Sequence, residues 1–175
     1  MAVYVGLIRA IGPATHAKMR MEPLREACAA AGLGDVATVG NTGNVLLRSE
    51  QSMAAVRRVL QAVVGRFGLD NEVFLDTPRR MAAVVAANPF PEAAAERPSE
   101  LGVCTFHKAP HWDVLTASHD GPEGLATIGA HLVVDYPAGI SSRLNIEKRL
   151  GTTMTMRNWR VFAALAEKAA ALARR

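Results

Sequence analysis

Cysteine is scarce in this sequence, and its two cysteines form no recognisable motif. Its 175 residues include only Cys28 and Cys104. Because there is no CxxC pair, the sequence gives no support for a zinc ribbon or a thiol redox motif. Cys28 falls on the apolar side of a predicted helix, and Cys104 falls within a predicted strand. We therefore expect two separate buried thiols.

The sequence also has no long hydrophobic run. Half of its residues are hydrophobic, which is enough to form a sizeable core. However, no stretch approaches the roughly 18 to 20 apolar residues of a membrane helix. The apolar N-terminal stretch has no basic leader before it and is typical of a first strand rather than a secretory signal. We expect a cytoplasmic protein with no membrane partner.

Catalytic motifs are absent as well. There is no Gly-x-Ser-x-Gly elbow, and neither cysteine lies in an evident activating environment. A nucleophile and a base act together only when the fold brings them within hydrogen-bonding distance, and no spacing in this sequence predicts such a pair. Whether the protein is an enzyme is left open. The conceivable pairs are Cys104 with His107 or His131, and Ser141 or Ser142 with His119.

Histidines gather in the second half of the chain without a metal-binding pattern. His107 and His111 are four residues apart, but Pro110 lies between them, so a shared helical face is not expected. We therefore predict no metal site and no cofactor. The residues considered were His107, His111, His119 and His131, with Asp113 and Asp120.

The hydrophobic pattern of the first half alternates strands with two amphipathic helices. One helix has Met21, Leu24, Cys28 and Ala31 at helical spacing, and the other has Val56, Leu60, Val63 and Phe67. The resulting β-α-β-β-α-β order is that of the ferredoxin-like plait, in which the first and third strands are adjacent. The predicted strands are Val3–Arg9, Asp35–Val39, Asn44–Arg48 and Asn71–Leu75.

The second half predicts a smaller, related α+β arrangement with C-terminal helices. Its expected strands are Leu101–Phe106, Leu125–Ile128 and His131–Tyr136, with residues 111–118 ambiguous between helix and strand. A short helix then spans Leu144–Leu150. The predicted fold class is therefore α+β, and the chain divides into three parts. Residues 1–87 form a plait and a following helix that Thr77 begins, residues 88–100 form a proline-rich linker, and residues 101–175 form a second subdomain.

Positive charge is concentrated at the C-terminal end. From Arg143 onward there are eight lysines and arginines against two acidic residues, so this segment carries a charge of +6. Residues 1–142 sum to −2, which gives the net charge of +4. Such a segment can attract phosphates, nucleic acid or an acidic partner, or it can simply be a solvated helical face. The first and third strands lack the exposed aromatic residues of an RNA-binding plait. Nucleic acid is therefore an improbable partner, though one left open.

Several short motifs resemble the bacterial family known as domain of unknown function 1697. They are Arg9-Ala10-Ile11-Gly12, Met21-Glu22-Pro23-Leu24-Arg25, Thr42-Gly43-Asn44-Val45, Asn88-Pro89-Phe90, and Glu147-Lys148-Arg149-Leu150-Gly151 followed by Thr155-Met156-Arg157-Asn158-Trp159. The resemblance implies tandem plait-like domains and implies no activity. Ala10 replaces the family's usual glycine, which leaves any role of that loop in doubt.

The candidate site residues are polar side chains at strand ends, turns and helix starts. Arginine and asparagine side chains in such places suit a phosphate or carboxylate group. The predicted partner is thus an anionic small molecule. The alternatives are that the asparagines satisfy a turn and the arginines pair with Asp35, Asp76 or Asp135, or that the chain is an interaction module without catalysis. The candidates are Arg9, Asn41, Asn44, Lys148, Arg157 and Asn158.

The segment from Glu147 to Trp159 is predicted to be chiefly structural. Gly151 would end one helix and Thr155 would cap the next, while Trp159 would be buried. These roles leave four polar residues unexplained, because a helix cap needs no arginine and a buried arginine needs a partner. They are Lys148, Arg149, Arg157 and Asn158.

Overall fold

The computed structural model describes residues 1–175 and contains two compact units. The first comprises Met1–Arg79 together with Glu167–Arg175, and the second comprises Arg80–Ala166. Each unit is built on one four-stranded antiparallel sheet. The α+β class predicted from the sequence is therefore confirmed. None of the helices combines the length and the apolar composition that crossing a membrane requires.

The first sheet has the strand order β2-β3-β1-β4. Its central strand β1 pairs antiparallel with both β3 and β4, and the pairing of Val3 with Arg48 fixes the register against β3. This is the ferredoxin-like arrangement, and the predicted adjacency of the first and third strands is confirmed. The strands are β1 Ala2–Ile8, β2 Gly34–Val39, β3 Asn44–Ser49 and β4 Val73–Asp76.

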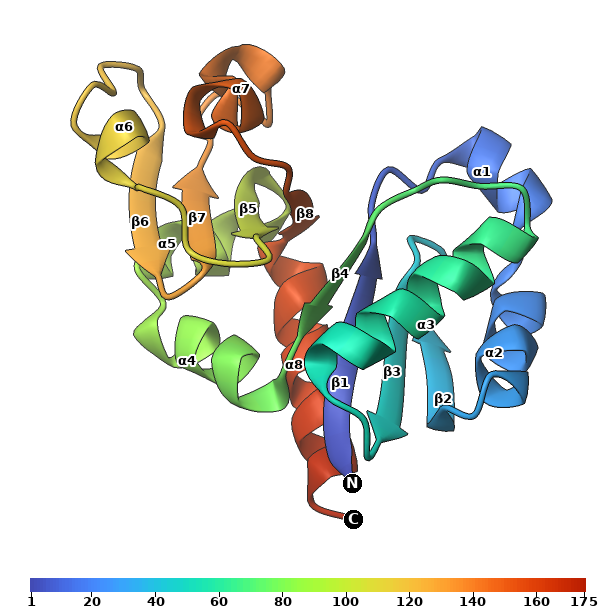
Figure 1. Cartoon of the computed structure of the whole chain (residues 1–175). Coiled ribbons are helices and arrows are strands. Elements are labelled where there is room, and N and C mark those ends of the chain that lie inside the picture. Colours follow the sequence, from blue (N-terminus) through green and yellow to red (C-terminus); the bar gives the residue numbers. More distant parts are fainter. The chain divides into compact units, whose positions relative to one another are not determined.

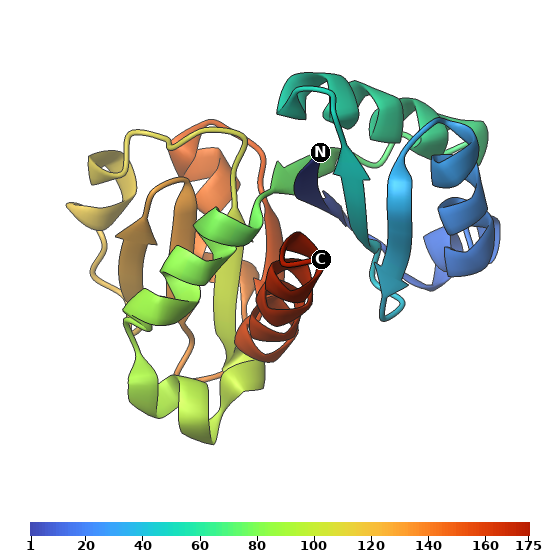
Figure 2. The same ribbon diagram turned by 90° about the horizontal axis from the view of Figure 1, so that it is seen from below.

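Two helices, α2 (Met21–Ala30) and α3 (Met53–Arg66), lie on one side of the first sheet (Figures 1 and 2). Their apolar residues pack on the strand residues that alternate toward them, such as Tyr4 and Ile8. Ser52 caps α3, because its side chain accepts a hydrogen bond from the Ala55 amide. A further short helix, α1 (Pro13–Lys18), precedes α2 where the sequence predicted a single helix.

The second sheet repeats the topology of the first. Its strand order, β6-β7-β5-β8, corresponds position by position to β2-β3-β1-β4. The helices α6 (Asp113–Thr116) and α7 (Ile146–Leu150) occupy the places of the two plait helices. The predicted related half is thus a complete plait. Its strands are β5 Leu101–Thr105, β6 Gly124–Ile128, β7 His131–Asp135 and β8 Thr155–Asn158.

The last strand of the second plait was not predicted. Thr155, expected to cap the final helix, begins β8 instead, and its prediction as a cap is wrong. The helix α8 (Trp159–Ala173) starts four residues later, where the Asn158 side chain accepts a hydrogen bond from the Val161 amide. Asn158 therefore supplies the N-terminal cap. Gly151 ends α7 in the left-handed conformation, as predicted.

Residues 88–100, predicted as a linker, are folded. They contain α5 (Pro91–Glu96) and a short 3-10 helix (Pro98–Glu100), and they follow α4 (Pro78–Ala87). The Arg97 guanidinium binds both carboxylate oxygens of Asp135, at 2.7 and 2.9 Å, and this hydrogen bonding raises the pKa of Arg97. The prolines thus begin short helices, a position where a missing amide hydrogen costs little.

Ala10 adopts a backbone conformation that favours glycine. Its φ is 57°, in the left-handed region, where a Cβ atom costs about 1–2 kcal/mol. This is the position where the sequence resemblance expects glycine. We predict that Ala10→Gly raises the free energy of unfolding by about 1 kcal/mol, measured by urea denaturation.

The control for this prediction is the same substitution in a helix. Ala62 is exposed within α3, where glycine is expected to lower the free energy of unfolding by about 1 kcal/mol. If Ala10→Gly lowers the free energy of unfolding as Ala62→Gly does, the left-handed conformation of Ala10 is not a source of strain.

Candidate functional site

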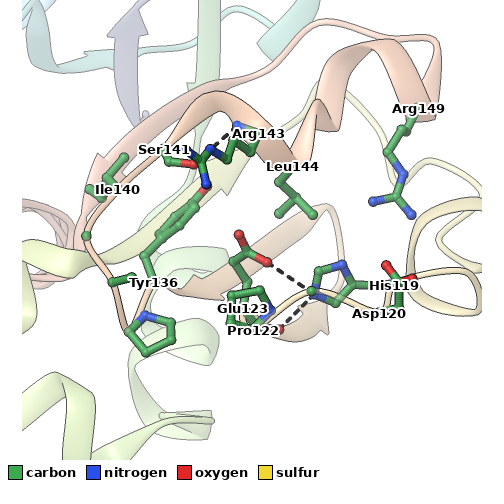
Figure 3. A pocket seen from close by; sticks show the side chains of 14 residues that line it. His119, Asp120, Pro122, Glu123, Tyr136, Ile140, Ser141, Arg143, Leu144 and Arg149 are labelled. Atoms are coloured by element: carbon green, nitrogen blue, oxygen red, sulfur yellow. Dashed lines mark hydrogen bonds and ion pairs between the residues drawn. The ribbon is translucent and has the colours of Figure 1, made fainter.

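The second unit contains a cavity of about 450 Å³ beside the loop that follows β7. Figure 3 shows His119, Arg143 and Arg149 among the side chains around it. The wall includes the loop before β6, the end of β7, and the residues leading into α7. It is lined by His119, Asp120, Gly121, Pro122, Glu123, Tyr136, Pro137, Ala138, Gly139, Ile140, Ser141, Arg143, Leu144 and Arg149.

The rim of the cavity is shaped by local turn chemistry. Gly139 has a φ of 88°, and its amide donates to the Tyr136 carbonyl at 3.0 Å, which closes a turn directly after β7. The Ser141 hydroxyl then accepts from the Arg143 amide and starts a short 3-10 helix, Ser142–Leu144. Asn145, also left-handed, redirects the chain into α7. These turns bring Arg143 and Arg149 to one cavity.

The two arginines of the cavity differ in how firmly they are held. Arg149 donates from Nη2 to the Leu115 carbonyl at 3.1 Å and to the Ser118 hydroxyl at 2.9 Å, which ties α7 to α6. Arg143 is exposed, and its guanidinium makes no hydrogen bond or ion pair within the protein. The cavity therefore has one anchored cation and one that is available to a ligand.

His119 and Glu123 form a close pair on another side of the cavity (Figure 3). The His119 Nε2 lies 2.9 Å from the Glu123 carbonyl oxygen and 3.5 Å from the Glu123 carboxylate. A carbonyl only accepts, so this nitrogen carries the proton and Nδ1 is the nitrogen left for other contacts. Both side chains are 12% exposed, so the pair is well defined by packing.

The deeper wall belongs to the core of the second unit. Tyr136 is 3% exposed, and burial raises its pKa, with Cys104 and Glu123 adding to the shift. Burial likewise raises the pKa of Cys104 to about 12, with the Glu147 carboxylate adding to the shift, so this thiol stays protonated. His131 pairs with Thr105, the residue after Cys104, and therefore points to the opposite face of the sheet. Cys104 and His131 accordingly do not form a nucleophile–base pair.

A second cavity, of about 410 Å³, adjoins the first. Tyr136, Ile140, Ser141 and Leu144 line both. Apart from Lys148 and Glu147, its character is largely apolar or weakly polar. The residues that line only this second cavity are Ser142, Asn145, Ile146, Glu147, Lys148, Met154 and Met156.

Three of the predicted site residues belong to the first unit. The Arg9 guanidinium lies 3.8 Å from the Glu72 carboxylate. Asn44 is 1% exposed and donates to the Val39 carbonyl and the Thr42 hydroxyl at 3.0 and 2.8 Å, which is the turn role that the sequence left as an alternative. Asn41 is exposed in the same turn. A ligand contact by any of them stays a prediction.

The other three predicted residues belong to the second unit, and only Lys148 lines one of its two cavities. Arg157 is 9% exposed and donates to the Thr155 hydroxyl at 2.8 Å and the Met156 carbonyl at 3.0 Å. Burial lowers its pKa to about 10. Asn158 is occupied as the cap of α8. These contacts give Arg157 and Asn158 structural roles, and a ligand contact by either stays a prediction.

The sequence did not predict His119, Arg143 and Arg149 as one set. The sequence pointed to His119 as a candidate for metal binding or catalysis and left Arg149 unexplained within the segment from Glu147 to Trp159. It placed Arg143 only in the basic C-terminal segment. The available signal was the Ser-Ser-Arg sequence after a glycine turn, which typically begins a helical turn and presents the arginine to solvent. That signal identifies Arg143 but not the cavity beside it.

The family model described as "Protein of unknown function (DUF1697)" matches residues 1–132. The segment from Glu147 to Trp159, the most specific part of the sequence resemblance, lies beyond this match. Among solved structures, the conserved bacterial protein SP0830 from Streptococcus pneumoniae is similar, with a TM-score of 0.72, 19% identity, and coverage of 97% of this chain and 99% of that chain. This likeness shows the fold alone. No curated protein matches the chain.

Proposed function

Since the chain belongs to the family described as protein of unknown function (DUF1697), whose description names no activity, we propose from the site that the second unit binds a small molecule bearing a phosphate or carboxylate group. The available Arg143 guanidinium beside a 450 Å³ cavity carries this proposal. Arg149 is the second cation of the site, and its fixed position reduces the side-chain entropy lost on binding.

The cavity is not uniformly positive. Glu123 is engaged with His119, while the Asp120 carboxylate is exposed at the rim. A carboxylate accepts hydrogen bonds from a hydroxyl or ammonium group. We therefore propose a ligand that carries hydrogen-bond donors in addition to its anionic group.

The alternative of an interaction module requires a contiguous apolar surface. The large hydrophobic residues that the protein exposes are Met1, Val114 and Ile140, and Ile140 lies at the rim of the cavities. Three such residues, with Met1 in a different unit from the other two, do not by themselves supply a contiguous apolar patch, so the cavity is the better-supported site.

We expect inorganic phosphate to raise the melting temperature of the wild-type protein at constant ionic strength, because binding to the native state stabilises it. Arg143→Gln should weaken phosphate binding about tenfold or more, since a charge-assisted hydrogen bond is lost, while leaving the unliganded melting temperature nearly unchanged. Isothermal titration calorimetry supplies the dissociation constants.

Arg160→Gln is the matched control. Arg160 is an exposed arginine of α8 that lines neither cavity. If wild type, Arg143→Gln and Arg160→Gln respond equally to phosphate, the effect is a general one of ions on a basic protein and the proposed site is wrong.

A further inference from the structure

The two adjoining cavities of the second unit differ in chemical character. The first holds five charged or titratable side chains: His119, Asp120, Glu123, Arg143 and Arg149. The second is lined mainly by Leu144, Ile146, Met154, Met156 and the ring of Tyr136, and its charged side chains are Glu147 and Lys148. A site that combines a few charged groups with an apolar compartment is typical of small-molecule binding sites.

The residues shared by the two cavities form a common wall. Tyr136 and Leu144 are 3% and 4% exposed, so the base of this wall is fixed in the core. Ile140 is 45% exposed, and the wall therefore reaches the surface at its outer end. A ligand seated in the charged cavity can cross over Ile140 and Ser141 into the apolar one.

From this juxtaposition we infer that the anionic ligand carries an apolar aryl or alkyl body. The phosphate or carboxylate head lies by Arg143, and the body lies among Ile140, Met154 and Met156. This inference rests on the proposed function and narrows its ligand class. It also accounts for an isoleucine side chain exposed at the junction of the two cavities.

The methionines suit such a compartment. Met154 and Met156 are only partly buried at the edge of the second unit's core, and their unbranched side chains adapt to a ligand of irregular shape. The Met154 amide is fixed by the Glu147 carboxylate at 2.9 Å, so the backbone there is held while the side chain is free to adjust. The Lys148 ammonium makes no hydrogen bond or ion pair within the protein, so it is available to a polar group on the body of the ligand.

The test compares inorganic phosphate with phenyl phosphate, both titrated by calorimetry into the full-length chain. These probes share the anionic head and differ by one ring. We expect phenyl phosphate to bind at least about tenfold more tightly, because burial of the ring removes apolar surface from water. Arg143→Gln should weaken both probes, whereas Ile140→Asn should remove most of the advantage of the ring, so that the ratio of the two dissociation constants falls toward one.

Val114→Asn is the matched control for Ile140→Asn. Val114 is 55% exposed in the same unit and lines neither cavity, so its replacement should alter neither affinity. Circular dichroism and the unliganded melting temperature verify that each variant is folded.

The outcomes separate this inference from the proposal beneath it. If phosphate binds through Arg143 but phenyl phosphate binds no more tightly, the apolar compartment is not part of the site while the anion site stands. If Ile140→Asn still binds phenyl phosphate more tightly than phosphate by the wild-type factor, the ring lies elsewhere and the inference is also wrong. Both the proposed anion site and the apolar compartment are wrong if neither probe binds at concentrations up to about 10 mM, roughly the weakest affinity expected of an arginine-based anion site.

Discussion

Replacing Trp159 with alanine is expected to lower the free energy of unfolding by about 3–5 kcal/mol. Trp159 is 7% exposed, in agreement with its predicted burial, and it shares a helical face with Phe162, which is fully buried. Removal of the indole therefore leaves a large cavity in the second unit. Guanidinium denaturation followed by far-ultraviolet circular dichroism measures the loss, since the signal does not depend on the tryptophan removed.

Val114→Ala provides the comparison for this substitution. Val114 is exposed in the same unit, so its truncation should change the free energy of unfolding by less than about 0.5 kcal/mol. A loss below about 1 kcal/mol for Trp159→Ala would mean that the indole contributes a contact surface rather than part of the core.

The second large effect is expected at Gly43, in the turn between β2 and β3. Its φ is 74°, and a Cβ built there would lie 2.9 Å from the Ile8 Cβ and 2.7 Å from the Ile11 Cγ1. Gly43→Ala thus combines left-handed strain of about 1–2 kcal/mol with overpacking of about 1–3 kcal/mol. We expect a total loss of about 2–5 kcal/mol in urea denaturation.

Gly40 separates the two contributions. It has a φ of 64° in the same turn, but a Cβ at this position meets no atom within 4 Å. Gly40→Ala should therefore lose only the conformational part, about 1–2 kcal/mol. Equal losses at both positions would show that contact with Ile8 and Ile11 has no energetic consequence, contrary to the packing argument.

The sequence predicts the first plait well, because its signals are strong and local. Helical spacing marks eight apolar residues of the two helices. Five of them are buried in the structure, Leu24, Cys28, Val56, Leu60 and Val63, and the other three, Met21, Ala31 and Phe67, are partly buried. Turn residues separate the strands, and Gly43 indeed adopts the left-handed conformation. The resemblance to the family is confirmed by the match over residues 1–132.

The strand β8 was missed because its residues contradict the usual pattern. Thr155 and Arg157 are the buried positions of this strand, whereas Met156 is only partly buried. A strand with a buried arginine and a threonine facing the core does not read as apolar alternation, and a threonine before a helix is typical of a cap. Only the pairing of β8 with β5 shows its role.

The candidate site was predicted less well than the fold. Of the predicted residues, Lys148 lines one of the two cavities described above, the more apolar one, and the other five line neither. The presence of His119, Arg143 and Arg149 around one cavity depends on α6 and α7 lying together, and on the left-handed residues Gly139 and Asn145 in the loops that precede α7. No local pattern specifies such a tertiary contact, so sequence reasoning selected polar residues at turns that serve the turns themselves.

The division of the chain into units has a consequence for biosynthesis. Residues 167–175 belong to the first unit, and the Leu172 carbonyl accepts a hydrogen bond from Arg48 of β3. The ribosome makes these residues only after residues 80–166, an interval of roughly 4–17 seconds at elongation rates of about 5–20 residues per second. Throughout that interval the nascent first plait lacks this segment, and the Arg48 side chain lacks the Leu172 carbonyl as its hydrogen-bond partner. Completion of the earlier unit thus waits for synthesis of the later one.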